Sequence, residues 1–142
     1  MIGKYPAKLD DKNRLFVPAK LRGELGSDFY VTLGVNCGRR CLTVYTAEDW
    51  DTLGKNYNAR PISQRSAATS LICMNANQCN PDKQFRFSLS QFLLDYAGIG
   101  RDVMIVGRAG QAEIWSADEF AAFEAENLTP EKLLASLEAI GL

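Results

Sequence analysis

Residues 9–26 read LDDKNRLFVPAKLRGELG, and residues 81–98 read PDKQFRFSLSQFLLDYAG. The two stretches share an Asp-x-x-x-Arg pattern that is followed by an apolar run and, later, by a glycine. The residues in equivalent positions are Asp10 and Asp82, Arg14 and Arg86, and Gly26 and Gly98. A match of this length raises the hypothesis that the chain contains one structural unit twice.

The correspondence continues downstream of these two stretches. YVTLG at residues 30–34 matches MIVG at 104–107, and TVYTAEDW at 43–50 matches EIWSADEF at 113–120. Between these matches, the loop GVNCGRRC of the first copy is longer than its counterpart GRAGQ. Gene duplication leaves an ordered series of matches with small changes in loop length. We therefore interpret the chain as two copies of one unit.

Each copy predicts the same order of elements. In the first copy, RLFV is typical of a strand and PAKLRGEL of a short helix that ends at Gly26. FYVTL and CLTVY then form a β-hairpin, and Thr46 is the expected N-cap of a following helix. In the second copy, Ser116 and Glu119 have the spacing of a capping box.

Two further helices are expected outside the repeated elements. Residues 62–74 predict a connecting helix with small residues on one side. In the tail, Thr129 is the expected N-cap of a helix with Pro130 in its first turn. The apolar stripe of this tail helix consists of Leu133, Leu134, Leu137 and Ile140. Such a stripe needs an apolar surface, on this chain or on a neighbour.

The repeated unit cannot close a sheet by itself. A strand, a short helix, a hairpin and a helix leave strand edges exposed, and a second copy is the natural partner for those edges. We therefore expect an α+β fold in which the two halves form an internal pseudo-dimer. Its expected centre is a small β-barrel, flanked by helices.

Composition favours a globular domain. The chain has 142 residues, of which 46% are hydrophobic and 23% charged. No apolar run is long enough to span a membrane, and the N-terminus lacks the apolar segment of a signal peptide. We expect a cytoplasmic protein that has no membrane partner.

Charge is unevenly distributed, although the formal net charge is only −1. The first 22 residues contain six basic side chains, namely Lys4, Lys8, Lys12, Arg14, Lys20 and Arg22. Residues 111–142 contain seven acidic residues and one lysine. A basic leading segment favours an anionic partner, and a solvated charged surface is the alternative interpretation.

The sequence contains no pattern that requires catalysis. It has no histidine, which is the commonest general base, and no nucleophile or phosphate-loop motif in the appropriate context. The four cysteines at positions 37, 41, 73 and 79 lack the two-residue spacing of a zinc knuckle. We expect free thiols, no cofactor, no small-molecule substrate and no enzymatic activity. A zinc-dependent module is the alternative.

The two Asp-x-x-x-Arg turns are the best candidates for function. An aspartate favours a turn because its side chain accepts hydrogen bonds from nearby backbone, and it can also orient the arginine four residues later. A guanidinium held in this way is prepared for bidentate contact with a phosphate or a guanine edge. The alternative is that each pair only stabilises its turn. The pattern is common by chance, but here it occurs at the same place in both copies.

Together, LDDKNRLFVPAKLRGELG, its repeat and EIWSADEF resemble the MraZ family. The resemblance runs from about Lys4 to about Glu126. It implies two tandem AbrB/SpoVT-like swapped-hairpin modules and a cytoplasmic, nucleoid-associated DNA-binding protein. It further implies repression of the protein's own promoter, upstream of division and cell wall genes, through tandem direct repeats. A homo-oligomeric ring is the implied assembly.

The chain departs from the family pattern mainly in its second copy. The residue before each motif arginine is usually glycine, but here it is Asn13 or Phe85. Asparagine tolerates a left-handed backbone conformation, whereas phenylalanine disfavours it. Ser90 and Leu94 also replace the usual proline and arginine, whose first-copy counterparts are Pro18 and Arg22. We expect a distorted second turn, a weaker DNA contact there, or an apolar contact made by Phe85.

These considerations define the candidate site and its alternatives. Arg14 and Asn13 are expected to read base edges, and Asp10 and Asp82 to orient the motif arginines. The remaining candidate DNA contacts are Lys4, Lys8, Lys12, Lys20, Arg22, Lys83 and Arg86. The expected modules are residues 4–50 and 76–120, with linker helices at 51–75 and a helical tail at 121–142. The alternatives are an AbrB-type antitoxin that binds DNA and a toxin protein, and a structural ring protein without a DNA role.

Overall fold

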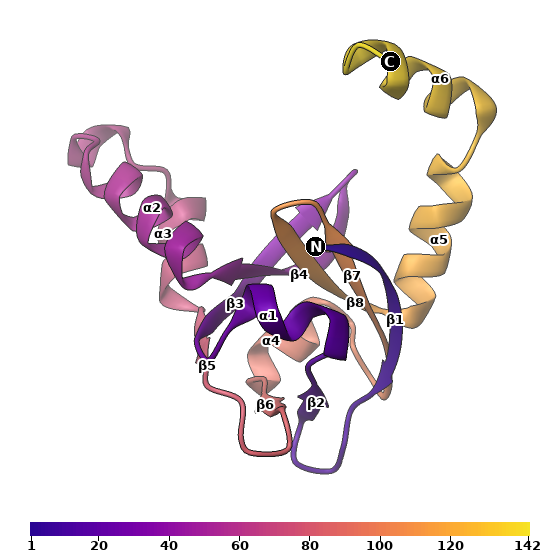
Figure 1. Cartoon of the computed structure of the whole chain (residues 1–142). Coiled ribbons are helices and arrows are strands. Elements are labelled where there is room, and N and C mark those ends of the chain that lie inside the picture. The colour runs from indigo at the N-terminus through magenta and orange to yellow at the C-terminus, as the bar shows by residue number, and fades with distance from the viewer.

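A computed structural model describes all 142 residues and shows a central antiparallel sheet with two helical arms (Figure 1). The strands are β1 (Ile2–Lys8), β2 (Arg14–Phe16), β3 (Phe29–Asn36), β4 (Arg39–Thr46), β5 (Asn77–Cys79), β6 (Arg86–Ser88), β7 (Asp102–Arg108) and β8 (Gln111–Ser116). The helices are α1 (Arg22–Leu25), α2 (Ala47–Asn58), α3 (Ala67–Met74), α4 (Gln91–Tyr96), α5 (Ala117–Asn127) and α6 (Pro130–Ala139). The expected α+β class is confirmed.

The two halves exchange their leading strands. β1 of the first half pairs with β7 of the second, and β5 of the second half pairs with β3 of the first. The two hairpins meet where β4 pairs with β8, which gives the sheet order β1-β7-β8-β4-β3-β5. β2 and β6 form a separate two-stranded ladder. The edges of the large sheet are β1 and β5, so its closure into a barrel stays a prediction.

The core is built from both halves because their strands are interleaved. One cluster of 20 buried residues includes Leu15 on β2, Val31 on β3 and Ile114 on β8. Phe29 and Phe87 join β3 to β6 in an edge-to-face pair, with ring centroids 5.1 Å apart. Full burial of such a side chain stabilises the fold by about 1.5–3 kcal/mol. Neither half could bury these residues alone.

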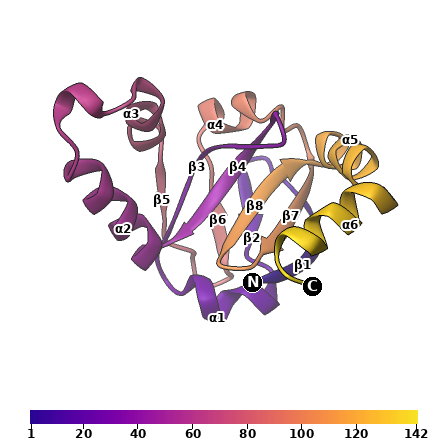
Figure 2. The same ribbon diagram turned by 90° about the horizontal axis from the view of Figure 1, so that it is seen from above.

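The repeated aromatic residues attach one arm to each hairpin. Tyr45 and Trp50 lie 5.8 Å apart in the first copy, and Trp115 and Phe120 lie 5.7 Å apart in the second. In both copies the first aromatic lies on the last strand of the hairpin and the second on the following helix. Figure 2 shows that α2 and α3 consequently lie at one end of the sheet and α5 and α6 at the other.

Some expected helix boundaries are confirmed and others are corrected. Thr46 caps α2 by accepting a hydrogen bond from the Asp49 amide at 3.2 Å, and Thr129 caps α6 in the same way. The capping box at Ser116 is wrong, because this serine makes no side-chain cap bond. Ser116 is instead buried at the end of β8, and the Glu119 carboxylate binds Arg39 at 3.0 Å.

Two predicted helices are shorter than expected. The stretch 18–25 forms a 3₁₀ turn, Ala19–Leu21, before the single turn of α1. The connecting stretch 62–74 forms a 3₁₀ turn at Ile62–Gln64 and then α3, capped by Ser66. None of the helices combines the length and the apolar character that crossing a membrane requires.

Candidate nucleic-acid interface

Asp10 closes the first turn with one carboxylate. Its Oδ1 accepts hydrogen bonds from the backbone amides of Lys12 and Arg14, both at 2.9 Å. Its Oδ2 accepts one from Arg14 Nε at 2.7 Å. The turn is completed by a backbone hydrogen bond from the Asn13 amide to the Asp10 carbonyl at 3.1 Å. Every acceptor position of Asp10 that faces the turn is therefore used to fix its shape.

Asp82 closes the second turn with the same set of contacts. Its Oδ1 accepts from the Gln84 and Arg86 amides at 2.8 and 3.0 Å, and its Oδ2 accepts from Arg86 Nε at 2.9 Å. Phe85 has a φ of +63°, close to the +56° of Asn13. The expected distortion of this turn is wrong. Many simultaneous contacts can hold a residue in a sparsely populated conformation.

The two turns lie side by side and are held together by backbone. β2 and β6 pair so that Arg14 lies opposite Ser88 and Phe16 opposite Arg86. Two further hydrogen bonds flank this ladder: Val17 N–H donates to the Phe85 carbonyl at 2.8 Å, and Leu89 N–H donates to the Asn13 carbonyl at 3.0 Å. Figure 1 shows both loops projecting from the same end of the molecule, away from α6.

Both motif arginines keep part of their guanidinium free. Arg14 and Arg86 each use Nε for the aspartate of the same turn, and the other two guanidinium nitrogens make no hydrogen bond within the chain. Each side chain is 26% exposed. An arginine that is anchored at Nε and open at its terminal nitrogens can donate two parallel hydrogen bonds to an external acceptor.

The carboxylates of both turns are stabilised in their charged form. For Asp10, partial burial raises the pKa, but hydrogen bonds from the Arg14 amide, the Arg14 side chain and the Lys12 amide outweigh it. For Asp82, the hydrogen bond from the Arg86 amide is the largest influence and lowers the pKa. Both pKa values therefore lie below the ordinary value of 3.8. The arginines keep a charged partner down to acidic pH.

The candidate lysines fall into two groups. Lys12 and Lys83 lie exposed on the two turns and form no ion pair. Lys4, Lys8 and Lys20 line one open groove of about 460 Å³, together with Phe16. Within this groove, Lys4 is paired with Glu124 of α5 at 2.9 Å, and Lys8 lies 3.7 Å from Asp102.

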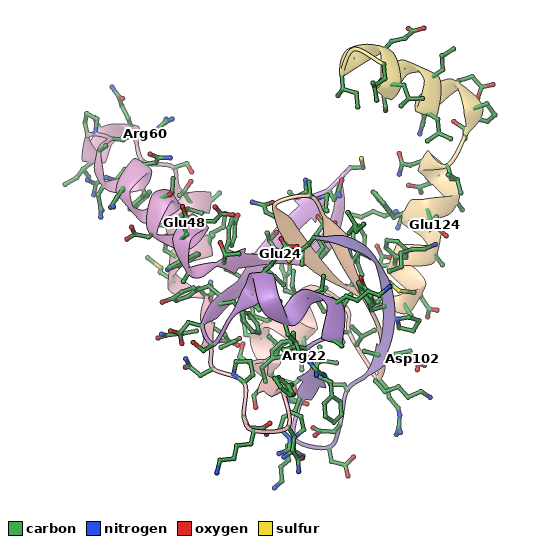
Figure 3. All side chains as sticks on the ribbon, in the orientation of Figure 1. Arg22, Glu24, Glu48, Arg60, Asp102 and Glu124 are labelled. Atoms are coloured by element: carbon green, nitrogen blue, oxygen red, sulfur yellow. The ribbon has the colours of Figure 1, made fainter.

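Lys4 and Lys8 line the same groove, but their acidic partners lie on different elements. In Figure 3, Glu124 lies on α5. Asp102, the first residue of β7, lies nearer the two turns. Lys12 and Lys83 lie on the turns themselves. Lys8, the last residue of β1, lies beside Asp102, and Lys4 pairs with Glu124 of α5.

Two contacts at the turns were not apparent in the sequence. Asn13 Nδ2 donates to Gln91 Oε1 on α4 at 3.3 Å. Arg22 donates from Nε to the Val17 carbonyl at 3.0 Å, and its guanidinium lies 3.8 Å from the centre of the Phe85 ring. Its expected DNA contact stays a prediction. The Asn13–Gln91 and Arg22–Phe85 contacts link residues from opposite halves of the chain, so no local spacing could reveal them. The only available signal was that Phe85 is unusual at its position.

The four cysteines are not gathered into one cluster. All four are free, with Cys41 and Cys79 buried, Cys73 half-buried and Cys37 exposed. No group of three or more cysteine, aspartate or glutamate side chains is arranged to hold a metal ion. Burial raises the pKa of Cys41 and Cys79 to about 12, which disfavours the thiolate that metals require.

Comparison with known proteins identifies relatives over the whole chain. A family model described as "MraZ protein, putative antitoxin-like" matches twice, at residues 1–73 and 72–135. The chain is 33% identical over 144 residues to the transcriptional regulator MraZ of Halothermothrix orenii, covering 99% of both chains. The protein of the same name from Clostridium tetani is 32% identical over 143 residues, again covering 99% of both. That from Caldicellulosiruptor bescii is 33% identical over 145 residues, covering 100% of this chain and 99% of the relative.

Proposed function

The chain belongs to the MraZ family, and from this premise we propose that it is a DNA-binding transcriptional regulator. The relatives are named as transcriptional regulators, which are not a class of enzyme. We accordingly assign no catalytic residue, cofactor or small-molecule substrate. The proposed partner is double-stranded DNA, and the proposed location is the cytoplasm, in association with the nucleoid.

The observation that carries the proposal is the pair of matching turns at one end of the molecule. Arg14 and Arg86 each offer two free guanidinium nitrogens, a geometry suited to a guanine edge in the major groove or to a phosphate. Asn13 is proposed to read a base edge beside Arg14; one of its amide N–H groups binds Gln91, and its Oδ1 and second N–H make no hydrogen bond within the chain. Lys12, Lys83, Lys8, Lys20 and Lys4 are proposed to contact phosphates and so set the register on the duplex; Lys4 would exchange its exposed pair with Glu124 for the phosphate.

The acidic arm supports this orientation. The helices α5 and α6, which carry most of the acids of residues 111–142, extend away from the turns (Figure 1). Their negative charge is therefore separated from the end that would approach DNA. A modest number of basic contacts per subunit can suffice if several subunits bind together.

We also make a proposal about how copies of the chain assemble and which DNA they bind. We propose that several copies form a ring, that the ring binds tandem direct repeats in the promoter of the division and cell wall gene cluster, and that binding represses transcription. Residues 4–50 and 76–120 are the proposed modules, joined by linker helices at 51–75 and followed by the tail at 121–142. We also propose that the exchanged strands form a swapped-hairpin, pseudo-dimeric barrel. Linked weak contacts along repeated DNA would supply the affinity.

The test is fluorescence anisotropy with labelled DNA from upstream of this protein's own gene. We expect binding that exceeds binding to scrambled DNA of the same length and that weakens steeply across a salt series, because lysines and arginines displace counterions. Equal binding to both DNAs, or no binding at low salt, would contradict the proposal. That result would favour a structural ring protein instead.

A second candidate function is that of an antitoxin that binds both DNA and a toxin protein. The observation in its favour is the exposed apolar stripe of the tail, formed by Leu133, Leu134 and Leu137 on α6 and by Ile140 directly after it. Purification of the tagged chain from its native host tests this idea. A small protein recovered in equal amount would support it, and recovery of the chain alone would count against it.

A further inference from the structure

Phe85 adopts a backbone conformation that its residue type disfavours. Its φ of +63° lies in the left-handed region, where phenylalanine is a genuine outlier and glycine or asparagine is common. Its side chain is also 44% exposed, so burial in a core does not explain the conformation. The hydrogen bonds of Asp82 fix the backbone of the second turn, and a contact of the Phe85 side chain itself would add to them.

Arg22 makes that contact from the opposite half of the chain. Its guanidinium lies 3.8 Å from the centre of the Phe85 ring, well within the range of a cation–π interaction. Its Nε donates to the Val17 carbonyl at 3.0 Å, and Val17 N–H in turn donates to the Phe85 carbonyl at 2.8 Å. Arg22 therefore reaches Phe85 in two ways: directly at the ring, and through Val17 at the backbone carbonyl. Figure 3 labels Arg22 between α1 and the two turns.

At the first turn, neither the left-handed residue nor the residue equivalent to Arg22 is the same as at the second. Its left-handed residue is Asn13, which tolerates positive φ without help. The position equivalent to Arg22 in the second copy is Leu94, which is buried in the core. An arginine therefore accompanies the turn that carries phenylalanine and is absent beside the turn that carries asparagine. This reciprocal pattern is difficult to explain if Arg22 serves only as a general basic contact.

We propose that Arg22 is a positioning residue for the second turn rather than a DNA contact. By stacking on Phe85 and anchoring Val17, it holds Phe85 in the left-handed conformation and so sets the direction of Arg86, the next residue. The geometric part of this inference is independent of DNA. Its consequence for binding rests on the proposed function.

The first experiment requires no DNA. We compare the single variants Arg22→Lys, Arg22→Ala and Phe85→Gly with the double variants that carry Phe85→Gly and either Arg22 substitution. Thermal unfolding and the amide NMR signals of residues 84–86 are measured for each variant. We expect both Arg22 substitutions to shift these signals and to lower the unfolding midpoint. The effects should be much smaller in the Phe85→Gly background, because glycine adopts positive φ without a partner. Equal effects in both backgrounds would overturn the proposal.

Arg65→Ala is the matched control. Arg65 also stacks on an aromatic ring, that of Tyr57 at 5.0 Å, and also donates from Nε to a backbone carbonyl, that of Arg60 at 2.9 Å. It lies on the α2–α3 arm, away from the turns. Its removal should leave the signals of residues 84–86 unchanged. A similar shift in this control would show that the signals report general loosening of the fold.

The second experiment measures affinity for the upstream DNA. We expect Arg22→Lys to weaken binding about as much as Arg22→Ala, by about three- to tenfold, because lysine keeps the charge but loses the planar stack. Full affinity with lysine would instead identify Arg22 as a charge that faces phosphate and overturn the positioning role. If the wild type binds no DNA, the proposed function fails, and the DNA-free comparison still decides whether Arg22 positions Phe85.

Discussion

At the scale of single residues, a carboxylate gives each turn its shape. Asp10 and Asp82 each accept two backbone amides on one oxygen and an arginine Nε on the other. The sequence spacing predicted the pairing of aspartate and arginine. It did not predict that a phenylalanine would adopt the same turn geometry as an asparagine, because the contact of the Phe85 ring with Arg22 crosses between the two halves of the chain.

The turns should respond to acid in a defined direction. Because the folded-state pKa values of Asp10 and Asp82 lie below 3.8, folding favours the charged carboxylates. Their stabilising contribution is present above about pH 3.8 and is lost as pH falls through the lower folded-state values. Carbon NMR titration of the two carboxyl groups should give midpoints below 3.8, and Asp10→Asn and Asp82→Asn should each remove one titration. Midpoints at or above 3.8 would contradict the described hydrogen bonds.

At the scale of elements, the short strand β2 has one buried face and one exposed face. Leu15 is 0% exposed and packs in the main core, whereas the adjacent Phe16 is 56% exposed. We expect Leu15→Ala to lower the free energy of unfolding by about 2–5 kcal/mol, since it leaves a cavity. Phe16→Ala should cost far less. Denaturant unfolding of both variants checks this, and equal losses would mean that β2 is not packed as described.

The internal repeat supplies a matched test of helix capping. Thr46 caps α2 with its side chain, whereas Ser116, at the equivalent position before α5, does not. Thr46→Ala should therefore lower the free energy of unfolding by about 0.5–2 kcal/mol. Ser116→Ala should lower it by less. Thermal or denaturant unfolding provides the comparison, and a larger loss at Ser116 would revive the capping box that the sequence predicts.

Local patterns explain which elements could be predicted. The hairpin strands and the caps Thr46 and Thr129 depend on nearby residues, so their signals were visible in the sequence. The strand β1, IGKYPAK, has little apolar alternation and contains a proline; it is a strand because it pairs with the distant β7. Likewise, the Glu119 side chain of the expected capping box binds a distant partner, Arg39. Elements defined by pairing across the chain gave no local signal.

At the scale of the whole molecule, α6 presents an apolar face that the chain itself does not cover. If copies assemble through this face, a charge placed on it should weaken assembly. We expect Leu134→Glu to reduce the mass of the assembly in sedimentation experiments, whereas Ala135→Glu, which lies off the stripe, should not. An unchanged assembly in Leu134→Glu would exclude this face as the contact between copies.

The candidate site was predictable in its anchor residues but not in its arrangement. The repeated motif identified Arg14 and Arg86, and the interleaved fold explains why two turns distant in sequence lie together. The separation of Lys4 from the turns followed from Glu124 on α5, a contact made only in the folded chain. Lys4 and Lys8, which line one groove, therefore have acidic partners on different elements.

We propose above all that Arg14 reads DNA from a turn whose shape is fixed before binding. The most direct test is anisotropy with the upstream DNA for wild type, Arg14→Ala and Arg86→Ala at one salt concentration. Arg14→Ala should weaken binding by about 1–3 kcal/mol for each engaged site, the range for a base-reading arginine, and Arg86→Ala should weaken it by less. Unchanged affinity in Arg14→Ala, with the fold intact, would mean that Arg14 does not read DNA. A larger loss in Arg86→Ala would reverse the ranking of the two turns.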